Sequence, residues 1–532
     1  MSIKLQDYIN TLLQSSLSDL FLNLIIHNNV TGGAEFSFLS STPIGLTLCF
    51  LLADGVLIAG VVTLIIVLGL KYKTLSAAAL TKVLLNVSTV SIYVSFFINL
   101  SGVVVGFTYL TKYHLSLFEN AYTFSLFSQL VKLVLLLIVG CLYTLFTSVY
   151  FSKVQSVELP LLIQIALVFC SVIVSSTNYA LLLLSLEGFS LILYIMTTLG
   201  RVYGGVTAAV KYFAFGTLGS IFLFWGSVHF YTIVPSFTFN IINVLLQQAP
   251  VESAILANSL EFATTAIAFG FMLKLGAAPM HQWVADVYAG SHMYITAFFS
   301  IFVKFLLFIV FLNLAVNFNC DALLQLFAAA SLLIGCVLSI RQVEIKRLLA
   351  YSSIVHIGFM LIGDFTASII YLLTYTASAL LLFSVLLNSE VAGKELIYLN
   401  DLRFVRKTSY SQTLYLVIAL ASSAGLPPFA GFYGKFLIWL GLIEDLYLLN
   451  NNYSYLILFL SIAISLITIY YYMRLIAYLF IGDDSDTCAV RIYTWTLSNK
   501  VYTLAFMQLV LALLVLLWTF IQPYLLNVIR VL

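Results

Sequence analysis

The stretch Phe271-Met-Leu-Lys-Leu-Gly-Ala-Ala-Pro-Met-His281 puts a charged lysine where a buried helix is expected to break. An apolar segment runs from about Ser259 into Lys274, and Gly276 and Pro279 follow directly. Proline removes a helical hydrogen bond and clashes with the preceding turn, and glycine adds backbone freedom. Inside a bilayer, broken backbone survives only where protein or a water-filled cavity surrounds it. An ionisable residue at such a place is a candidate functional residue. We therefore expect the rest of the chain to serve as a scaffold around Lys274 and a few similar residues.

The composition excludes a water-soluble protein. Of the 532 residues, 62% are hydrophobic and 8% are charged, whereas soluble domains carry roughly 25% charged residues. Runs of about 20 apolar residues are long enough to cross a bilayer as helices, and the alternation typical of barrel strands is absent. The net charge of +2 is spread along the chain, so nucleic acid is not an expected partner.

Fourteen apolar segments predict an all-α polytopic membrane protein. They cover about 44–70, 83–111, 123–150, 159–177, 178–200, 206–232, 258–278, 293–315, 322–340, 347–363, 366–388, 411–443, 453–480 and 501–526. The long segment 233–257 is nearly uncharged and is expected to be a loop. The segment 389–410 is the most polar connection.

A second break suggests an internal repeat. Ala424-Gly-Leu-Pro-Pro-Phe429 interrupts the segment 411–443, and Lys435 follows. The two breaks lie five spans apart, and an odd separation gives opposite orientations, as in inverted repeats with discontinuous helices. The expected parts are an N-terminal extension with one interfacial helix (1–43), a three-helix region (44–150), a first repeat (159–315), a second, inverted repeat (322–480), and a loop with the final transmembrane helix (481–532).

Basic residues in the connections predict the orientation. When the connections alternate between two sides, one side receives only Lys4, Lys112 and Arg530. The opposite, basic side is expected to face the cytoplasm or the mitochondrial matrix. Both termini then lie on the other side of the membrane.

Several charged residues remain inside the predicted spans. They are Asp54, Lys132, Glu187, Lys211, Glu261, Lys274, Lys304 and Lys435. A charge at mid-bilayer costs about 2.5–3.5 kcal/mol on insertion scales, so each needs a partner or a function. For Lys132 and Glu261 the alternative is a place near a span end, from which the charged group reaches the interface.

Glu187 and Lys211 are expected to form an ion pair. They lie on consecutive antiparallel helices and carry opposite charges, and a buried carboxylate stays ionised only with a partner. The alternative is a static pair that only fixes packing. His356 is a candidate proton relay because imidazole titrates near neutral pH; the alternative is a histidine held by hydrogen bonds in the core.

The sequence contains no signature of a bound cofactor. The six cysteines never form CxxC, and neither GxGxxG nor GxxxxGK[ST] occurs. No two histidines have metal-ligand spacing on one face. We therefore expect this chain to bind no cofactor and no metal.

Three motifs carry a family resemblance. They are Lys274-Leu-Gly-Ala-Ala-Pro-Met-His-Gln-Trp-Val-Ala-Asp-Val-Tyr288, Ile345-Lys-Arg-Leu-Leu-Ala-Tyr-Ser-Ser-Ile-Val-His-Ile-Gly358 and Gly425-Leu-Pro-Pro-Phe-Ala-Gly-Phe-Tyr-Gly-Lys435. In this order they resemble the subunit 2 family of respiratory complex I, NADH:ubiquinone oxidoreductase, over roughly residues 45–480. The resemblance implies an antiporter-like fold of fourteen helices with two inverted five-helix repeats and broken helices 7 and 12.

The resemblance also implies roles for the buried charges. Glu187 and Lys211 would form the coupling pair, Lys274 would be the central lysine of helix 7, and Lys304 would match the lysine of helix 8. Lys435 would match the terminal residue of helix 12, where the sibling subunit 4 usually carries glutamate. The chain would then be a non-redox, proton-translocating subunit of NADH:ubiquinone reductase.

Cofactors and partners follow from the same resemblance. NADH, FMN, iron–sulfur clusters and ubiquinone would be bound in partner subunits. The implied partners are other membrane-arm subunits, including antiporter-like subunit 4 and small membrane subunits, together with lipids such as cardiolipin. The rival functions are a subunit of a cation/proton antiporter and a structural membrane-arm subunit with static ion pairs. An enzyme with its own active site would need a catalytic constellation that the sequence lacks.

The chain departs from the family pattern in one place that matters below. The family usually continues Pro-Asp-Val-Tyr-Glu-Gly-Ala-Pro, whereas this chain has Ala285, Ala289, Ser291 and His292. Such drift, with heavy use of Phe and Tyr, suggests a divergent mitochondrial genome. The expected location is the mitochondrial inner membrane with both termini facing the intermembrane space; the alternative is a bacterial plasma membrane.

Overall fold

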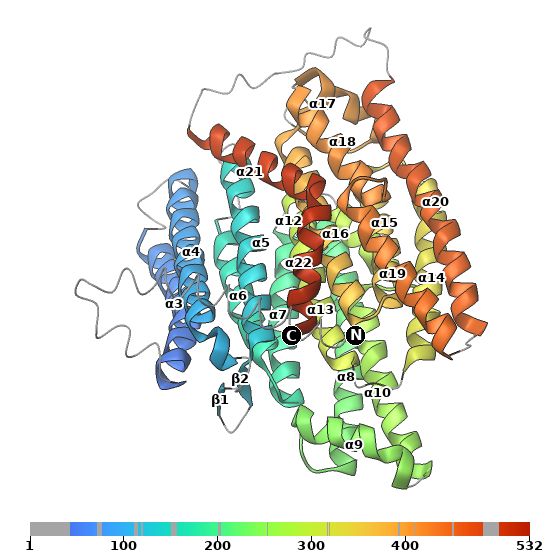
Figure 1. Ribbon diagram of the computed structural model, residues 1–532. Coiled ribbons are helices and arrows are strands. Elements are labelled where there is room, and N and C mark those ends of the chain that lie inside the picture. Colours follow the sequence, from blue (N-terminus) through green and yellow to red (C-terminus); the bar gives the residue numbers. More distant parts are fainter. Residues whose placement is uncertain are drawn as a thin grey trace, which may run out of the picture.

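The computed structural model describes residues 43–71, 77–110, 115–118, 121–150, 157–199, 204–252, 254–316, 318, 320–391, 394–408, 410–449, 452–481 and 499–531. The N-terminal extension and its interfacial helix, expected over 1–43, lie outside these residues except for position 43. Figure 1 shows a bundle of long helices that run side by side, with short elements at its two ends.

Residues 43–315 form helices at every predicted span. Their elements are α3 (Pro43–Lys71), α4 (Ala77–Leu110), β1 (Leu115–Leu117), β2 (Tyr122–Phe124), α5 (Leu126–Tyr150), α6 (Leu159–Ser175), α7 (Tyr179–Thr198), α8 (Gly205–Ile233), α9 (Phe239–Glu252), α10 (Ala254–Leu275), α11 (Gln282–Gly290), α12 (Met293–Phe298), the π-helix η1 (Phe299–Val303) and α13 (Lys304–Ala315). Helices are required here because a helix satisfies its own backbone hydrogen bonds in lipid. The helices α9 and α11 are additional and lie outside the predicted spans.

The second repeat and the C-terminal region also follow the predicted spans. Their elements are α14 (Asp321–Ile340), α15 (Ile345–Ile362), α16 (Phe365–Asn388), β3 (Glu390–Val391), β4 (Lys394–Glu395), the 3₁₀ helix η2 (Leu399–Leu402), α17 (Arg403–Thr408), α18 (Tyr410–Ala424), α19 (Ala430–Leu449), α20 (Asn452–Phe480), α21 (Asn499–Leu516) and α22 (Trp518–Val531). The strands form two antiparallel hairpins, β1–β2 and β3–β4.

The predicted all-α polytopic fold is confirmed. Within the described residues, 10 helices are long and apolar enough to cross a membrane, or 11 if a bent C-terminal pair is one span. That pair, Leu504–Leu516 and Phe520–Leu526, is bent by 76°, so the segment predicted as one span over 501–526 consists of two helices. The number fourteen stays a prediction.

The expected loop over 233–257 is wrong, because most of it forms α9. The apolar residues Phe239, Ile242 and Leu246 recur at helical spacing, and Ile242 and Leu246 are buried. This spacing is an amphipathic helix signal, which the low charge of the segment obscured. Figure 1 shows α9 at one end of the bundle and α17 at the other.

Two spans form the centre of the bundle. Over the continuous helix Met293–Ala315, 100% of the most apolar window is buried, and over α16 the share is 94%. The shares for α3 and α8 are 22% and 33%, so these helices lie at the periphery. The central spans are therefore enclosed by the rest of the protein, whereas the peripheral helices present apolar side chains outward.

Candidate functional site

Both predicted breaks are present, and they share one backbone geometry. In α10 the amide of Gly276 donates to Leu273 O (3.2 Å) and that of Ala277 to Met272 O (3.0 Å). In α18 the corresponding amides of Gly425 and Leu426 donate to Ser422 O (2.9 Å) and Ala421 O (3.1 Å). This is the Schellman motif, which ends a helix at a residue in the left-handed conformation.

Glycine is required at the C-terminal end of each of the two broken helices. Gly276 has φ +75° and Gly425 has φ +82°, values that residues with a Cβ rarely adopt. A Cβ on Gly276 would lie 2.3 Å from Val284 Cγ2, and one on Gly425 would lie 3.0 Å from Lys435 Nζ. The glycines therefore let later side chains approach the ends of the half-helices.

Lys274 lies in the last turn of α10 and is buried. A cation is favoured there because the last carbonyls of a helix are partially negative. Its Nζ lies 3.6 Å from Glu187 Oε1 on α7, too far for a direct hydrogen bond. A small cavity beside Lys274 is lined by Ser190, Tyr194, Tyr212 and Trp283 among others. Trp283 of α11 donates its Nε1 proton to Leu273 O (3.1 Å) and so holds the two halves of the break together.

The expected Glu187–Lys211 ion pair is wrong. Lys211 of α8 pairs with Asp286 of α11, and Glu187 pairs with Lys274. The reason is the break itself, because α11 follows it and packs against α8, which brings a carboxylate to Lys211 that helix order alone does not reveal. Asp286 belongs to the first quoted motif but lies outside every predicted span, so counting charges within spans missed it.

The side chains of Lys211, Asp286 and Glu187 are 55%, 40% and 40% exposed. Neighbouring apolar residues of α7 and α8, such as Leu184 (72%) and Val210 (62%), are exposed as well. This face of the chain therefore combines apolar side chains with an acid and an ion pair.

Lys304 lies at the point where the π-helix η1 returns to α-helix. π-Helical turns are rare and are frequent at functional sites. Lys304 is buried, and within the described residues no hydrogen-bond partner reaches its Nζ. The ring of Tyr288, with its centroid 5.7 Å from Nζ, is a cation–π neighbour.

His356 of α15 is held between two tyrosines. Its Nδ1 lies 2.8 Å from Tyr371 Oη and its Nε2 lies 3.0 Å from Tyr472 Oη. The imidazole is buried. A histidine hydrogen-bonded at both nitrogens can accept a proton on one side and release one on the other.

Lys435 of α19 closes the second break. It is 2% exposed, and its Nζ donates to Ala424 O (2.8 Å) and Thr468 Oγ1 (3.0 Å). Ala424 is the last residue of α18, so the lysine caps the carbonyl end of a half-helix. The structure thus places a lysine at each half-helix end, with Lys304 on one of the two central spans and His356 on α15.

Lys132 does not reach the interface from a span end. Its Nζ lies 2.9 Å from both Asp54 Oδ2 and Tyr122 Oη, and Tyr122 donates to Asp54 Oδ2 (2.6 Å). All three residues are buried between α3, β2 and α5. This triad lies outside both repeats. Within the described residues, no group of three His, Cys, Asp or Glu side chains could hold a metal ion.

Comparison with known proteins identifies the family. Residues 176–468, more than half of the chain, match the family described as NADH:quinone oxidoreductase/Mrp antiporter, TM. The chain belongs to this family. A curated relative, NADH-quinone oxidoreductase subunit N of Laribacter hongkongensis (strain HLHK9), is 33% identical over 344 residues, which are 62% of this chain and 68% of the relative.

Solved structures agree with this assignment. A chain of respiratory complex I from Thermus thermophilus, solved with bound aureothin, has a TM-score of 0.70 and 26% identity, and the match covers 88% of this chain and 98% of that chain. A chain of the membrane-bound sulfane sulfur reductase, an archaeal respiratory membrane complex, shares the fold with a TM-score of 0.74, 18% identity and coverage of 89% and 96%. The family predicted from the three motifs is confirmed.

The observed pairing predicts which charges are energetically coupled. In a double-mutant cycle, Lys211→Met and Asp286→Asn should interact by about 0.5–3 kcal/mol, as residues in direct contact do. Lys211→Met and Glu187→Gln should add within about 0.5 kcal/mol. Both cycles are measured through the free energy of unfolding in mixed detergent micelles. A larger coupling energy between Lys211 and Glu187 than between Lys211 and Asp286 would instead support the ion pair expected from helix order.

The buried triad predicts an asymmetric loss of stability. Lys132→Met leaves Asp54 buried without a counter-ion and should cost about 3–5 kcal/mol. The double variant Lys132→Met with Asp54→Leu should cost less than the single variant, because no charge remains stranded. Thermal unfolding of the solubilised protein compares the two. A single variant as stable as the parent would mean that Asp54 is neutral in the folded protein.

Proposed function

We propose that this chain is a proton-translocating membrane subunit of an NADH:quinone oxidoreductase of the complex I type. The observation that carries the proposal is Lys304, a buried lysine for which the described residues provide neither a carboxylate nor a hydrogen-bond acceptor. A permanently charged ammonium at this place would have the cation–π contact with Tyr288 but no counter-ion among the described residues to offset its burial. Such a lysine is suited to taking up and releasing a proton through internal water.

The mechanism begins at Glu187. While its carboxylate is ionised 3.6 Å from Lys274, the ammonium form of Lys274 is stabilised. Quinone reduction in partner subunits would move this carboxylate or neutralise it. Lys211 could do so if it left Asp286, because it lies on α8, which packs against α7. Lys274 then releases its proton towards Lys304.

The later steps use α15 and α19. His356 can receive the proton because each of its ring nitrogens is hydrogen-bonded to a tyrosine hydroxyl. Lys435 passes the proton out when its contacts with Ala424 O and Thr468 Oγ1 open. NADH, FMN, iron–sulfur clusters and ubiquinone belong to partner subunits in this proposal.

The exposed charges indicate where a partner binds. Lipid tails cannot solvate the charged face that carries Glu187, Lys211 and Asp286. We propose that another membrane-arm subunit covers this face, with antiporter-like subunit 4, small membrane subunits and lipids such as cardiolipin as the candidates. The multi-pass membrane location agrees with the bacterial relatives, which support a plasma membrane. The mitochondrial inner membrane and the facing of the termini stay predictions.

Lys274→Met tests the proton path. Proton translocation and coupled quinone reduction should fall by roughly tenfold, equivalent to about 1.4 kcal/mol in the barrier, because the first proton site loses its ammonium. Arg347→Gln removes an exposed charge on α15 that pairs with Glu344, and it is the control for the loss of a cation outside the proposed path. Both rates are measured per assembled complex in vesicles. Full pumping by an assembled Lys274→Met complex would favour the structural subunit with static pairs.

The composition of the native complex separates the proposal from an ion antiporter. Gentle solubilisation of the native membrane, followed by mass spectrometry and optical spectra, should find this chain with flavin and iron–sulfur subunits. These subunits would supply the redox reaction that the chain itself lacks. A small, flavin-free assembly of antiporter-like chains would move the function to cation/proton exchange.

A further inference from the structure

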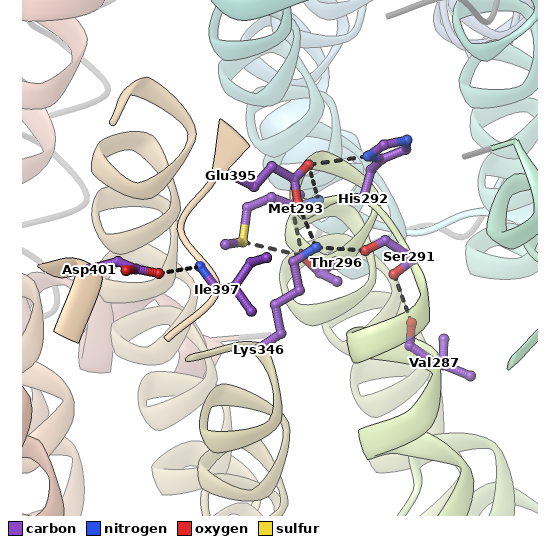
Figure 2. Close-up of polar contacts among 9 residues, drawn as sticks. All are labelled: Val287, Ser291, His292, Met293, Thr296, Lys346, Glu395, Ile397 and Asp401. Carbon is purple, nitrogen blue, oxygen red and sulfur yellow. Dashed lines mark hydrogen bonds and ion pairs between the residues drawn. The ribbon is translucent and has the colours of Figure 1, made fainter. Parts of the chain in front are cut away.

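A polar cluster joins the two repeats at the end of the bundle where α17 lies (Figures 1 and 2). Glu395 of β4 accepts hydrogen bonds at Oε1 from His292 Nδ1 and Met293 N (both 3.2 Å), and its Oε2 accepts from Lys346 Nζ (2.6 Å). Lys346 also donates to Ser291 O (2.8 Å). Ser291 and His292 precede the Lys304 helix of the first repeat, whereas Lys346 lies in the first turn of α15 in the second.

The chain holds Glu395 in place from both sides. The backbone after β4 is tied to the segment before α15, because Ile345 N donates to Ile397 O (2.9 Å) and Leu399 N donates to Val343 O (3.0 Å). Asp401 Oδ2 accepts from Ile397 N (3.1 Å) and from Tyr398 N (2.8 Å). Figure 2 shows the Asp401–Ile397 contact beside the cluster. The carboxylate of Glu395 is therefore positioned by a fixed turn.

The carboxylate of Glu395 stays ionised near neutral pH. Burial alone would raise the pKa of Glu395, but the hydrogen bond from His292 and the charge of Lys346 lower that pKa to about 2. A carboxylate whose folded-state pKa is lowered stabilises the fold above its unfolded pKa, and this stabilisation is lost only as the pH falls through the folded value. For Glu395 the window runs from the ordinary value of 4.5 down to about 2. The pair with Lys346 is therefore intact throughout the working range.

The cluster fixes two proton sites at one depth. Lys304 lies eleven residues after Met293, and His356 lies ten residues after Lys346. At 1.5 Å per residue, both lie roughly 15–17 Å from the cluster along their helices. Tyr375 supports the same register deeper in the core, since its hydroxyl donates to Ser300 O (3.2 Å) in η1 and its ring packs 5.0 Å from that of His356.

We propose that Glu395, His292 and Lys346 form an inter-repeat clamp that sets the axial register of the Lys304 helix against the His356 helix, and that proton transfer between the repeats depends on it. The inference rests on the proposed function. The three residues are positioning residues, because none touches the proton sites. A helix is stiff along its axis, so a shift at its clamped end moves the buried residue by a similar distance. A misplacement of about 1 Å is enough to slow a transfer step strongly.

The direction of the His292 imidazole is fixed within the cluster. Its Nδ1 donates to Glu395 Oε1 (3.2 Å). His292 also stacks on Tyr294, with ring centroids 5.4 Å apart, which fixes the direction of its Nδ1.

Glu395→Gln in the assembled complex tests the clamp. The number of protons moved per NADH oxidised should fall by roughly threefold or more, because the amide cannot keep the ion pair that sets the register. Glu344→Gln is the matched control. Glu344 is 34% exposed, compared with 33% for Glu395, and it pairs with Arg347 at the same end of α15 (3.1 Å). The control should keep the parental ratio.

Two further variants separate positioning from assembly. Lys346→Arg keeps the charge and should keep most of the proton-to-NADH ratio, whereas Lys346→Met should lower it as Glu395→Gln does. If Glu395→Gln does not assemble, His292→Gln retains a neutral donor and should pump normally, and His292→Leu should not. Equal ratios in Glu395→Gln and Glu344→Gln, or in His292→Leu and His292→Gln, would overturn the clamp. If Lys274→Met lowers pumping and the clamp variants do not, the clamp alone is rejected. If Lys274→Met pumps normally, the proposed function is rejected.

Discussion

The carbonyl ends of two half-helices inside the membrane determine the rest of this structure. A helix that stops in lipid leaves carbonyls without donors, and no water is available to satisfy them. At the second break the donor is Lys435, whose Nζ lies 2.8 Å from Ala424 O. At the first break the indole of Trp283 reaches Leu273 O (3.1 Å), and Lys274 itself lies in the last turn. Breaking a helix at these depths thus requires buried cations or donors, and the glycines provide the room for them.

The two breaks have the same backbone and different charges. Asp286 lies ten residues after the left-handed Gly276, and Lys435 lies ten residues after the left-handed Gly425. In the first repeat this position holds a carboxylate that reaches outward to Lys211. In the second it holds an ammonium that reaches inward to the half-helix end. One backbone geometry therefore gives an exposed ion pair after the first break and a buried lysine that caps the half-helix at the second.

The sequence predicted what depends on local chemistry. Apolar runs located the helices, and the Gly–Pro pattern located both breaks, because these features act within a few residues of themselves. It did not predict the partner of Lys211, since Asp286 reaches it only through the packing of α11 on α8. It also did not predict that Lys132 is buried against Asp54 and Tyr122, three residues from three separate elements. Partner choice among buried charges is a tertiary property, and periodicity carries no information about it.

The partners of a buried lysine indicate whether it serves as a fixed structural support or as a site that exchanges a proton. Lys132 has a carboxylate and a phenol within 2.9 Å, so removing its proton would strand Asp54, and the group acts as a fixed support. Lys304 has no hydrogen-bond partner among the described residues and has the ring of Tyr288 as a cation–π neighbour, so the loss of its proton would strand no carboxylate. The proposed proton site needs this second arrangement. The packing around Lys304 must then fix the position of this side chain without fixing its protonation state. The π-helical turn and the helix ends at Glu395 can do this.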